Sequence, residues 1–231
     1  METKTTSLKE PEVQPDGALQ VLRGTHSGRI WIIGNGPSLR GQWETLGRMN
    51  DEPTFVVNSF FREPPPGLRP TFYAANYVVW KEGRVKPTPE TNQVSSGLRF
   101  FLNSGPYLAV PGWVMVLKKN AAPGEGVLGL GEEVLHRIPS SATSPYVMAQ
   151  LAGWMGFNEI YFLGCEQTDG YFYDREEHRD TPYFLDRFKG ERWRILKRKY
   201  EAAHIKVRDC TPGGLLNNIL GYEVLEEVLD G

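Results

Sequence analysis

The sequence predicts a single α/β domain built on a Rossmann-like, mostly parallel sheet flanked by helices. Short, continuous apolar runs recur along the chain, and helical patterns fall between several of them. Such runs are typical of strands that are buried on both faces of a parallel sheet. Right-handed crossovers between parallel strands then place helices on both faces. The expected strands are 29–33, 54–57, 71–75, 108–110, 113–117, 160–163 and 205–207.

Three segments have the apolar spacing of helices. They are Ser38 to about Arg48, Ser144–Gly156 and Tyr183–Ala203, and Gly190 weakens the pattern in the middle of the last one. Ser144 is expected to cap its helix, with Pro145 as the first helical residue. Residues 82–106 are rich in Gly, Pro, Ser and Asn, and we expect irregular structure there.

Composition limits the kind of protein this is. The chain has 231 residues, of which 40% are hydrophobic and 23% charged, as in an ordinary globular domain. We expect a loosely attached tail over residues 1–26 and one domain over 27–231. Lys and Arg number 26 against 28 Asp and Glu, which argues against nucleic-acid binding by bulk charge.

The sequence also gives expectations about location and partners. No apolar run reaches the roughly 18 residues of a membrane span, and the polar start lacks the apolar segment of a secretory signal. The 2 cysteines are too few for a disulfide framework. We therefore expect a cytoplasmic protein with no membrane span and no nucleic-acid partner. A homo-oligomer is compatible with these features.

The segment Gly34-Asn35-Gly36-Pro37-Ser38 follows the first expected strand and opens a helix. Its glycines permit a tight turn and close approach of a ligand, while free N–H groups and the helix dipole favour an anion. This predicts a phosphate or nucleotide site, although the same residues also suit a turn that merely starts a helix. Leu39 stands where a dinucleotide fingerprint needs its third glycine, so nicotinamide and flavin cofactors are not expected.

Polar residues follow four of the expected strands. They are Asn35, Asn58, Asn76 and Glu166. In an open parallel sheet the carboxyl ends of the strands lie along one edge, where ligands bind. A single asparagine at a strand end is explained by its tolerance of turns. Three in succession favour a shared pocket for a neutral sugar, a base edge or a phosphate.

The segment from 165 to 183 combines acids, a histidine and aromatic rings, as a lid over a polar substrate would. Glu166 and His178 are its candidate catalytic residues, and His178 could serve as a general base or be a solvated loop histidine. Asp169 and Asp174 could form a metal site, but the signal for it is weak.

Several motifs together resemble the bacterial sialyltransferases of glycosyltransferase family 42, over about residues 29–220. A related resemblance is to uncharacterised proteins grouped with archaeal hydroxymethylpterin diphosphokinases. The residues that carry the resemblance are Ile32–Leu39, Val57–Phe61, Asn76, Thr143–Met148, Gly156–Gly164 and Cys210–Leu216. The resemblance implies a variant of the GT-A-like fold and a nucleotide-activated donor, typically a CMP-sugar.

The resemblance also implies roles for individual residues. The donor would be bound by Gly34, Asn35, Gly36, Ser38, Asn58, Asn76 and Ser144. The acceptor, a sugar or another small molecule, would lose its proton to a base, assigned to His178, while Tyr171 and Tyr173 assist the departing phosphate. The family needs no chelated metal.

Two alternatives remain open from the sequence. A diphosphokinase-like enzyme would use ATP and Mg²⁺, with Glu166, Asp169 and Asp174 as the ligands. A non-catalytic nucleotide-binding protein would keep the pocket without the base. The family places its histidine close before the last long helix, near Phe184 in this chain.

Overall fold

The computed structural model describes residues 17–76, 94, 97–103, 110–120, 133–140, 143–166, 171–172 and 187–231. Its centre is an 8-stranded sheet in which every pairing between the named strands is parallel. The strands are β1 (Arg29–Ile33), β2 (Thr54–Val57), β3 (Phe72–Asn76), β4 (Arg99–Asn103), β5 (Val114–Asn120), β6 (Ile138–Ser140), β7 (Glu159–Leu163) and β8 (Lys206–Asp209). The predicted α/β class with a parallel sheet is confirmed.

The order of the strands is β6-β5-β4-β3-β2-β1-β7-β8. The chain therefore builds the sheet outward from β1 to β6, and then returns to the other side of β1 to add β7 and β8. The point of reversal lies between β1 and β7, where Ile33 pairs with Leu163. In open α/β sheets the crevice at such a reversal is the usual place for a ligand.

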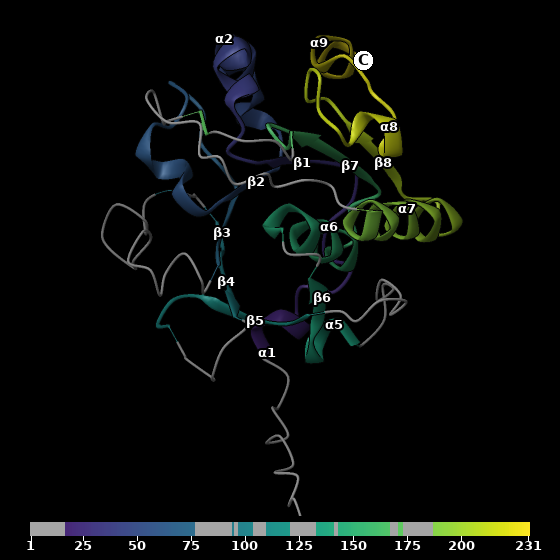
Figure 1. The fold of residues 1–231 in the computed structure, drawn as a ribbon. Coiled ribbons are helices and arrows are strands. Elements are labelled where there is room, and N and C mark those ends of the chain that lie inside the picture. The colour runs from purple at the N-terminus through teal and green to yellow at the C-terminus, as the bar shows by residue number, and fades with distance from the viewer. Residues whose placement is uncertain are drawn as a thin grey trace, which may run out of the picture.

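The helices and 3₁₀ turns cover both faces of the sheet (Figure 1). On one face lie α1 (Gly17–Gln20), α5 (Glu133–His136), α6 (Ser144–Met155), α7 (Arg187–Ala202) and α8 (Asn217–Leu220). On the other lie η1 (Pro37–Gln42), α2 (Trp43–Gly47), η2 (Arg48–Asp51), η3 (Asn58–Arg62) and α9 (Leu225–Asp230).

Successive side chains of a strand point to opposite faces of the sheet, so the strands contribute to a hydrophobic core on each face. Ile30 and Ile32 of β1 face the core under α6, whereas Trp31 and Ile33 face the core under α2, and all four are fully buried. Helix α6 is buried along nearly its whole length and crosses the middle of the sheet, contacting β1, β2 and β3. This position brings the amino end of α6 to the carboxyl edge of the sheet.

Four parts of the secondary structure differ from the sequence-based expectation. Strand β4 lies inside the segment 82–106 that was expected to be irregular, and β6 was not expected at all. The first helical segment is a 3₁₀ turn followed by the short helix α2. Helix α6 begins at Ser144 itself, so its N-cap is Thr143, which makes no side-chain capping bond.

Residues 17–26, expected to belong to a loose tail, pack against the domain. Leu19 is 1% exposed, and its carbonyl accepts a hydrogen bond from Trp154 Nε1 at 3.4 Å. The N–H groups of Gly24 and His26 donate to carbonyls at the end of α6. None of the helices in the described ranges has the length and apolar character to cross a bilayer.

Candidate ligand site at the carboxyl edge of the sheet

The first turn, residues 34–38, is held against the end of β7. The N–H of Gly34 donates to the carbonyl of Leu163, and that of Gly36 to the carbonyl of Gly164, both at 2.8 Å. A Cβ atom on Gly34 would overlap the Gly164 carbonyl oxygen, so only glycine permits this approach. The turn and the end of β7 therefore form one tightly packed unit at the point of strand reversal.

The carboxylate of Glu166 occupies the amino end of η1. Its Oε1 accepts a hydrogen bond from the Ser38 N–H at 2.7 Å, and a Cβ atom on Gly36 would overlap the carboxylate. The side chain is only 7% exposed. A ligand phosphate was expected at this place, but in the structure the carboxylate of Glu166 fills it.

Next to the first turn lies a group that we call the Asn–Ser cluster: Asn58, Asn76 and Ser144. Asn58 Nδ2 and Asn76 Nδ2 both lie within hydrogen-bonding distance of Ser144 Oγ, at 3.4 and 3.3 Å. The Asn76 N–H donates to Asn58 Oδ1 at 2.9 Å. The structure thus brings together the carboxyl ends of β2 and β3 and the amino end of the 12-residue helix α6.

Asn35 borders the same cluster. Its Nδ2 donates to the carbonyl of Val57, the residue before Asn58, at 3.0 Å. Its Oδ1 is buried and has no hydrogen-bond partner among the residues that the structure describes. Ser38 Oγ is likewise buried without a hydrogen-bond partner among the described residues. Buried acceptors normally have partners, so these atoms suit contacts with a ligand or with water.

Asn58 adopts a conformation that places its peptide group in the cluster. Its φ is 51°, in the left-handed region that asparagine tolerates better than most residues. Its carbonyl accepts a hydrogen bond of 2.6 Å from the hydroxyl of Tyr73, whose pKa is raised by burial. A neutral, buried phenol therefore fixes the backbone from which the Asn58 side chain projects.

Two polar residues that the sequence analysis did not select lie farther along the same edge. Asn103 ends β4 and is 1% exposed, so each of the four strands β1 to β4 ends in an asparagine or has one within the next two residues. Lys118 of β5 is 8% exposed, and burial lowers its pKa to about 8. Asn103 was missed because β4 was not expected. Lys118 directly follows the expected strand 113–117, but its burial could not be read from the sequence.

A second buried acid, Asp209, lies at the end of β8. It is fully buried, and its Oδ1 accepts a hydrogen bond from the Thr211 N–H at 3.0 Å. Burial, with a smaller contribution from the charge of Glu166, raises the pKa of Asp209 to about 7.

Burial, together with the charges of Asp209 and Glu166, also raises the pKa of Cys165 well above its usual value, so its thiol is protonated and unsuited to act as a nucleophile.

The lid residues fall mostly outside the described ranges. Tyr173, His178, Asp169 and Asp174 are among those outside, and their candidate roles rest on the sequence. Tyr171 is half-buried beside Phe172, whose N–H donates to the Asn35 carbonyl at 2.9 Å. That bond places Tyr171 near the first turn. Within the described ranges no three His, Cys, Asp or Glu side chains are grouped to hold a metal ion.

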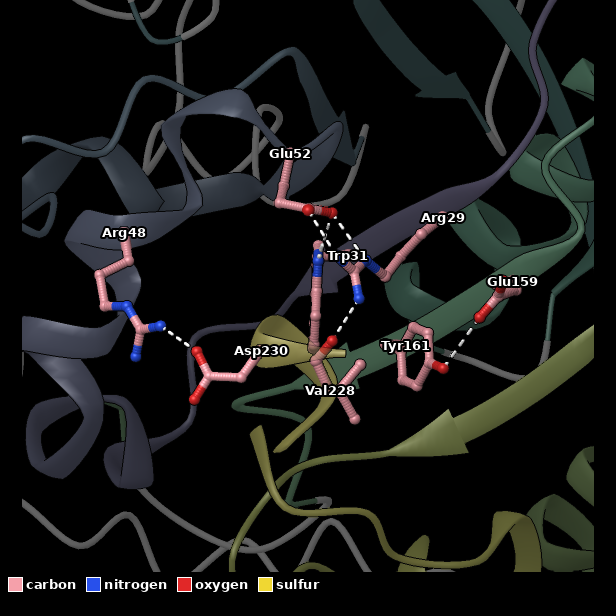
Figure 2. A network of polar contacts seen from close by, with 8 residues as sticks. All are labelled: Arg29, Trp31, Arg48, Glu52, Glu159, Tyr161, Val228 and Asp230. Carbon is pink, nitrogen blue, oxygen red and sulfur yellow. Dashed lines mark hydrogen bonds and ion pairs between the residues drawn. The ribbon is translucent and has the colours of Figure 1, made fainter. Parts of the chain in front are cut away.

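A polar cleft of about 690 Å³ opens at the opposite edge, where β1, β7 and β8 begin. Figure 2 shows its central network, in which Arg29 donates to both carboxylate oxygens of Glu52, at 2.6 and 2.8 Å, and to the Val228 carbonyl. Trp31 Nε1 also donates to Glu52, and Tyr161 donates to Glu159. Arg29 and Glu52 form an ion pair, and the bond from Arg29 to Val228 joins α9 to the sheet, so we assign the network a structural role.

The parallel, helix-flanked sheet places this chain among α/β proteins with a GT-A-like fold. Its structure is similar to that of the sialyltransferase CST-II in complex with a trisaccharide acceptor and CMP, with a TM-score of 0.54 and 20% identity over 84% of this chain and 85% of that one. It is also similar to the monofunctional α-2,3-sialyltransferase Cst-I from Campylobacter jejuni, with a TM-score of 0.53 and 18% identity over 94% of this chain and 85% of that one.

At these identities the similarity establishes the fold. It supports the sialyltransferase resemblance at that level and adds nothing to the diphosphokinase resemblance. No family model matches the chain, and no curated protein matches its sequence significantly.

Proposed function

We propose that the protein is a sialyltransferase-like glycosyltransferase that uses a CMP-sugar donor. The observation that carries the proposal is the Asn–Ser cluster, in which two side-chain amides converge on the hydroxyl of Ser144 at the amino end of α6. The dipole of a 12-residue helix favours an anion at that end, and amides suit a phosphate oxygen or a base edge.

The hydrogen bonds inside the cluster support this assignment. At 3.3 and 3.4 Å the contacts with Ser144 Oγ are longer than well-formed hydrogen bonds. The groups can therefore exchange them for bonds to a ligand at little cost. The fold similarity gives independent support, since the CST-II structure holds CMP and a trisaccharide acceptor. For this chain we propose a sugar or another small molecule as acceptor.

We expect CMP to raise the melting temperature of the wild-type protein, with or without Mg²⁺. A ligand at 100 times its Kd adds about 2.7 kcal/mol to the free energy of unfolding. Screening CMP, UDP, GDP, ATP and CMP-sialic acid identifies the donor base. Stabilisation by ATP only when Mg²⁺ is present would instead support the diphosphokinase-like alternative.

Replacing Ser144 by alanine is expected to weaken CMP binding about tenfold, because one polar contact to an ionised group is lost. The change removes a single oxygen atom and leaves the helix intact. Ser27→Ala is the matched control, since Ser27 is exposed and lines the polar cleft at the opposite edge. Isothermal titration calorimetry measures both affinities. Equal affinities in the two variants would contradict binding at the cluster.

The catalytic base remains a proposal from the sequence, and we assign it to His178. His178→Ala should lower kcat for sialyl transfer about 100-fold, at the lower end of what general-base catalysis contributes. His204→Asn is the control, because His204 is exposed and has a φ of 60°, which asparagine tolerates. If the protein binds CMP but neither wild type nor variant turns over CMP-sialic acid, the non-catalytic alternative is favoured.

A further inference from the structure

The crevice at the strand reversal, between β1 and β7, is the usual ligand position in such a sheet, yet here it is filled from within. In the first turn the N–H group of every second residue donates a hydrogen bond to the segment 163–166. Gly34 and Gly36 donate to the carbonyls of Leu163 and Gly164, and Ser38 donates to the carboxylate of Glu166. Asn35, between the two glycines, turns its side chain the other way, toward the end of β2.

Glu166 contributes a charge at this position as well as a hydrogen bond. Its Oε1 is bonded to Ser38, while Oε2 is buried and has no hydrogen-bond partner among the residues that the structure describes. The carboxylate fills the space beside Gly36 where a side chain would otherwise stand. A buried carboxylate with one unpartnered oxygen is costly, so the hydrogen bond to the turn has to offset part of that cost.

We propose that Glu166 is a positioning residue: its carboxylate acts as a built-in anion that fixes the first turn, so that Asn35 borders the Asn–Ser cluster. The donor phosphate then binds at the cluster and not at the first turn, because a second anion beside Glu166 would be repelled. This inference rests on the proposed function for its ligand, but the anion position itself does not.

The test removes the Glu166 carboxylate by mutation and supplies formate as a replacement. Glu166→Ala should lower the melting temperature and weaken CMP binding about tenfold, since one charge-assisted bond is lost and Asn35 is no longer held. Sodium formate, compared with sodium chloride at equal ionic strength, should restore both quantities in Glu166→Ala and change neither in the wild type. A structural cavity alone would not respond to formate more than to chloride.

Two further variants make the outcome decisive. Glu166→Gln keeps the acceptor for Ser38 but not the charge, so it should fold and bind CMP with intermediate affinity. Formate should change neither its melting temperature nor its affinity for CMP. Glu191→Ala removes an exposed glutamate of α7 and should behave as the wild type. The proposal is overturned if formate and chloride act alike on Glu166→Ala, or if Glu166→Gln and Glu166→Ala both bind CMP as the wild type does.

The two proposals fail in different ways. If the wild type binds no nucleotide, the proposed function is wrong, while the formate effect on the melting temperature of Glu166→Ala still reports on the anion position. If CMP binds and Ser144→Ala weakens it, but formate has no specific effect, only the positioning role of Glu166 is wrong.

Discussion

Gly36→Ala is expected to destabilise the protein by about 1–3 kcal/mol, which lowers the melting temperature by up to about 10 °C. The backbone of Gly36 has a φ of -69°, so alanine fits the conformation and the loss is purely a matter of space. The new methyl group would overlap the Glu166 carboxylate, which has to leave Ser38. Urea denaturation measures the change in the free energy of unfolding.

A double-mutant cycle identifies the cause. The nearest atoms to a Cβ at Gly36 all belong to the side chain of Glu166, so Gly36→Ala should cost almost nothing when Glu166 is already alanine. Gly34→Ala is the contrasting variant, because its Cβ would overlap the backbone carbonyl of Gly164 and gains no relief from Glu166→Ala. Additive effects of Gly36→Ala and Glu166→Ala would show that the two residues do not interact.

Stability should fall as pH rises through the titration of Asp209. Burial raises the pKa of this carboxyl from 3.8 to about 7 in the folded protein. The folded state therefore holds the proton more tightly than the unfolded chain, and the stabilising contribution is complete below about pH 4 and lost by about pH 7. At 1.36 kcal/mol per pKa unit the total contribution is about 4 kcal/mol.

Asp209→Asn tests this dependence. The amide oxygen can still accept the hydrogen bond from the Thr211 N–H, but the side chain no longer titrates. Between about pH 5 and pH 8 the wild type should lose about 3 kcal/mol relative to the variant, measured by urea denaturation at each pH. Asp51→Asn, at an exposed position, is the control and should follow the wild type. Parallel curves for wild type and Asp209→Asn would contradict a raised pKa.

Most of the sheet could be predicted because its strands are short apolar runs with clear ends. Strand β1, with Ile30 to Ile33 fully buried, shows this pattern plainly. Strand β4 offers only Phe100, Phe101 and Leu102 as its apolar signal, in a stretch otherwise rich in turn-forming residues. Strand β6 has 3 residues and a proline, which only an edge strand tolerates. Neither has a local signature that separates it from a loop.

The alignment of Asn35, Asn58 and Asn76 along one edge could be predicted because it follows from parallel strands alone, whereas Asn103 was missed with β4. The position of Glu166 could not be predicted, because it depends on which strand lies beside β1. Ser38 and Glu166 are 128 residues apart in the sequence, and only the return of the chain to β7 brings them together. The sequence indicates an anion position at the first turn, but it does not reveal that a carboxylate of the chain accepts the hydrogen bond from Ser38.

The order of the strands also bears on how the protein is made. A ribosome that has produced β1 to β6 has released a sheet whose first strand still has an unpaired edge, since its neighbour β7 comes later. An unpaired strand edge exposes backbone N–H and C=O groups to which strands of other chains can bind. Until residue 166 emerges, the glycine-rich bend also lacks its carboxylate partner. Completion of the nascent sheet, and protection of its central strand from aggregation, therefore depend on the last third of translation.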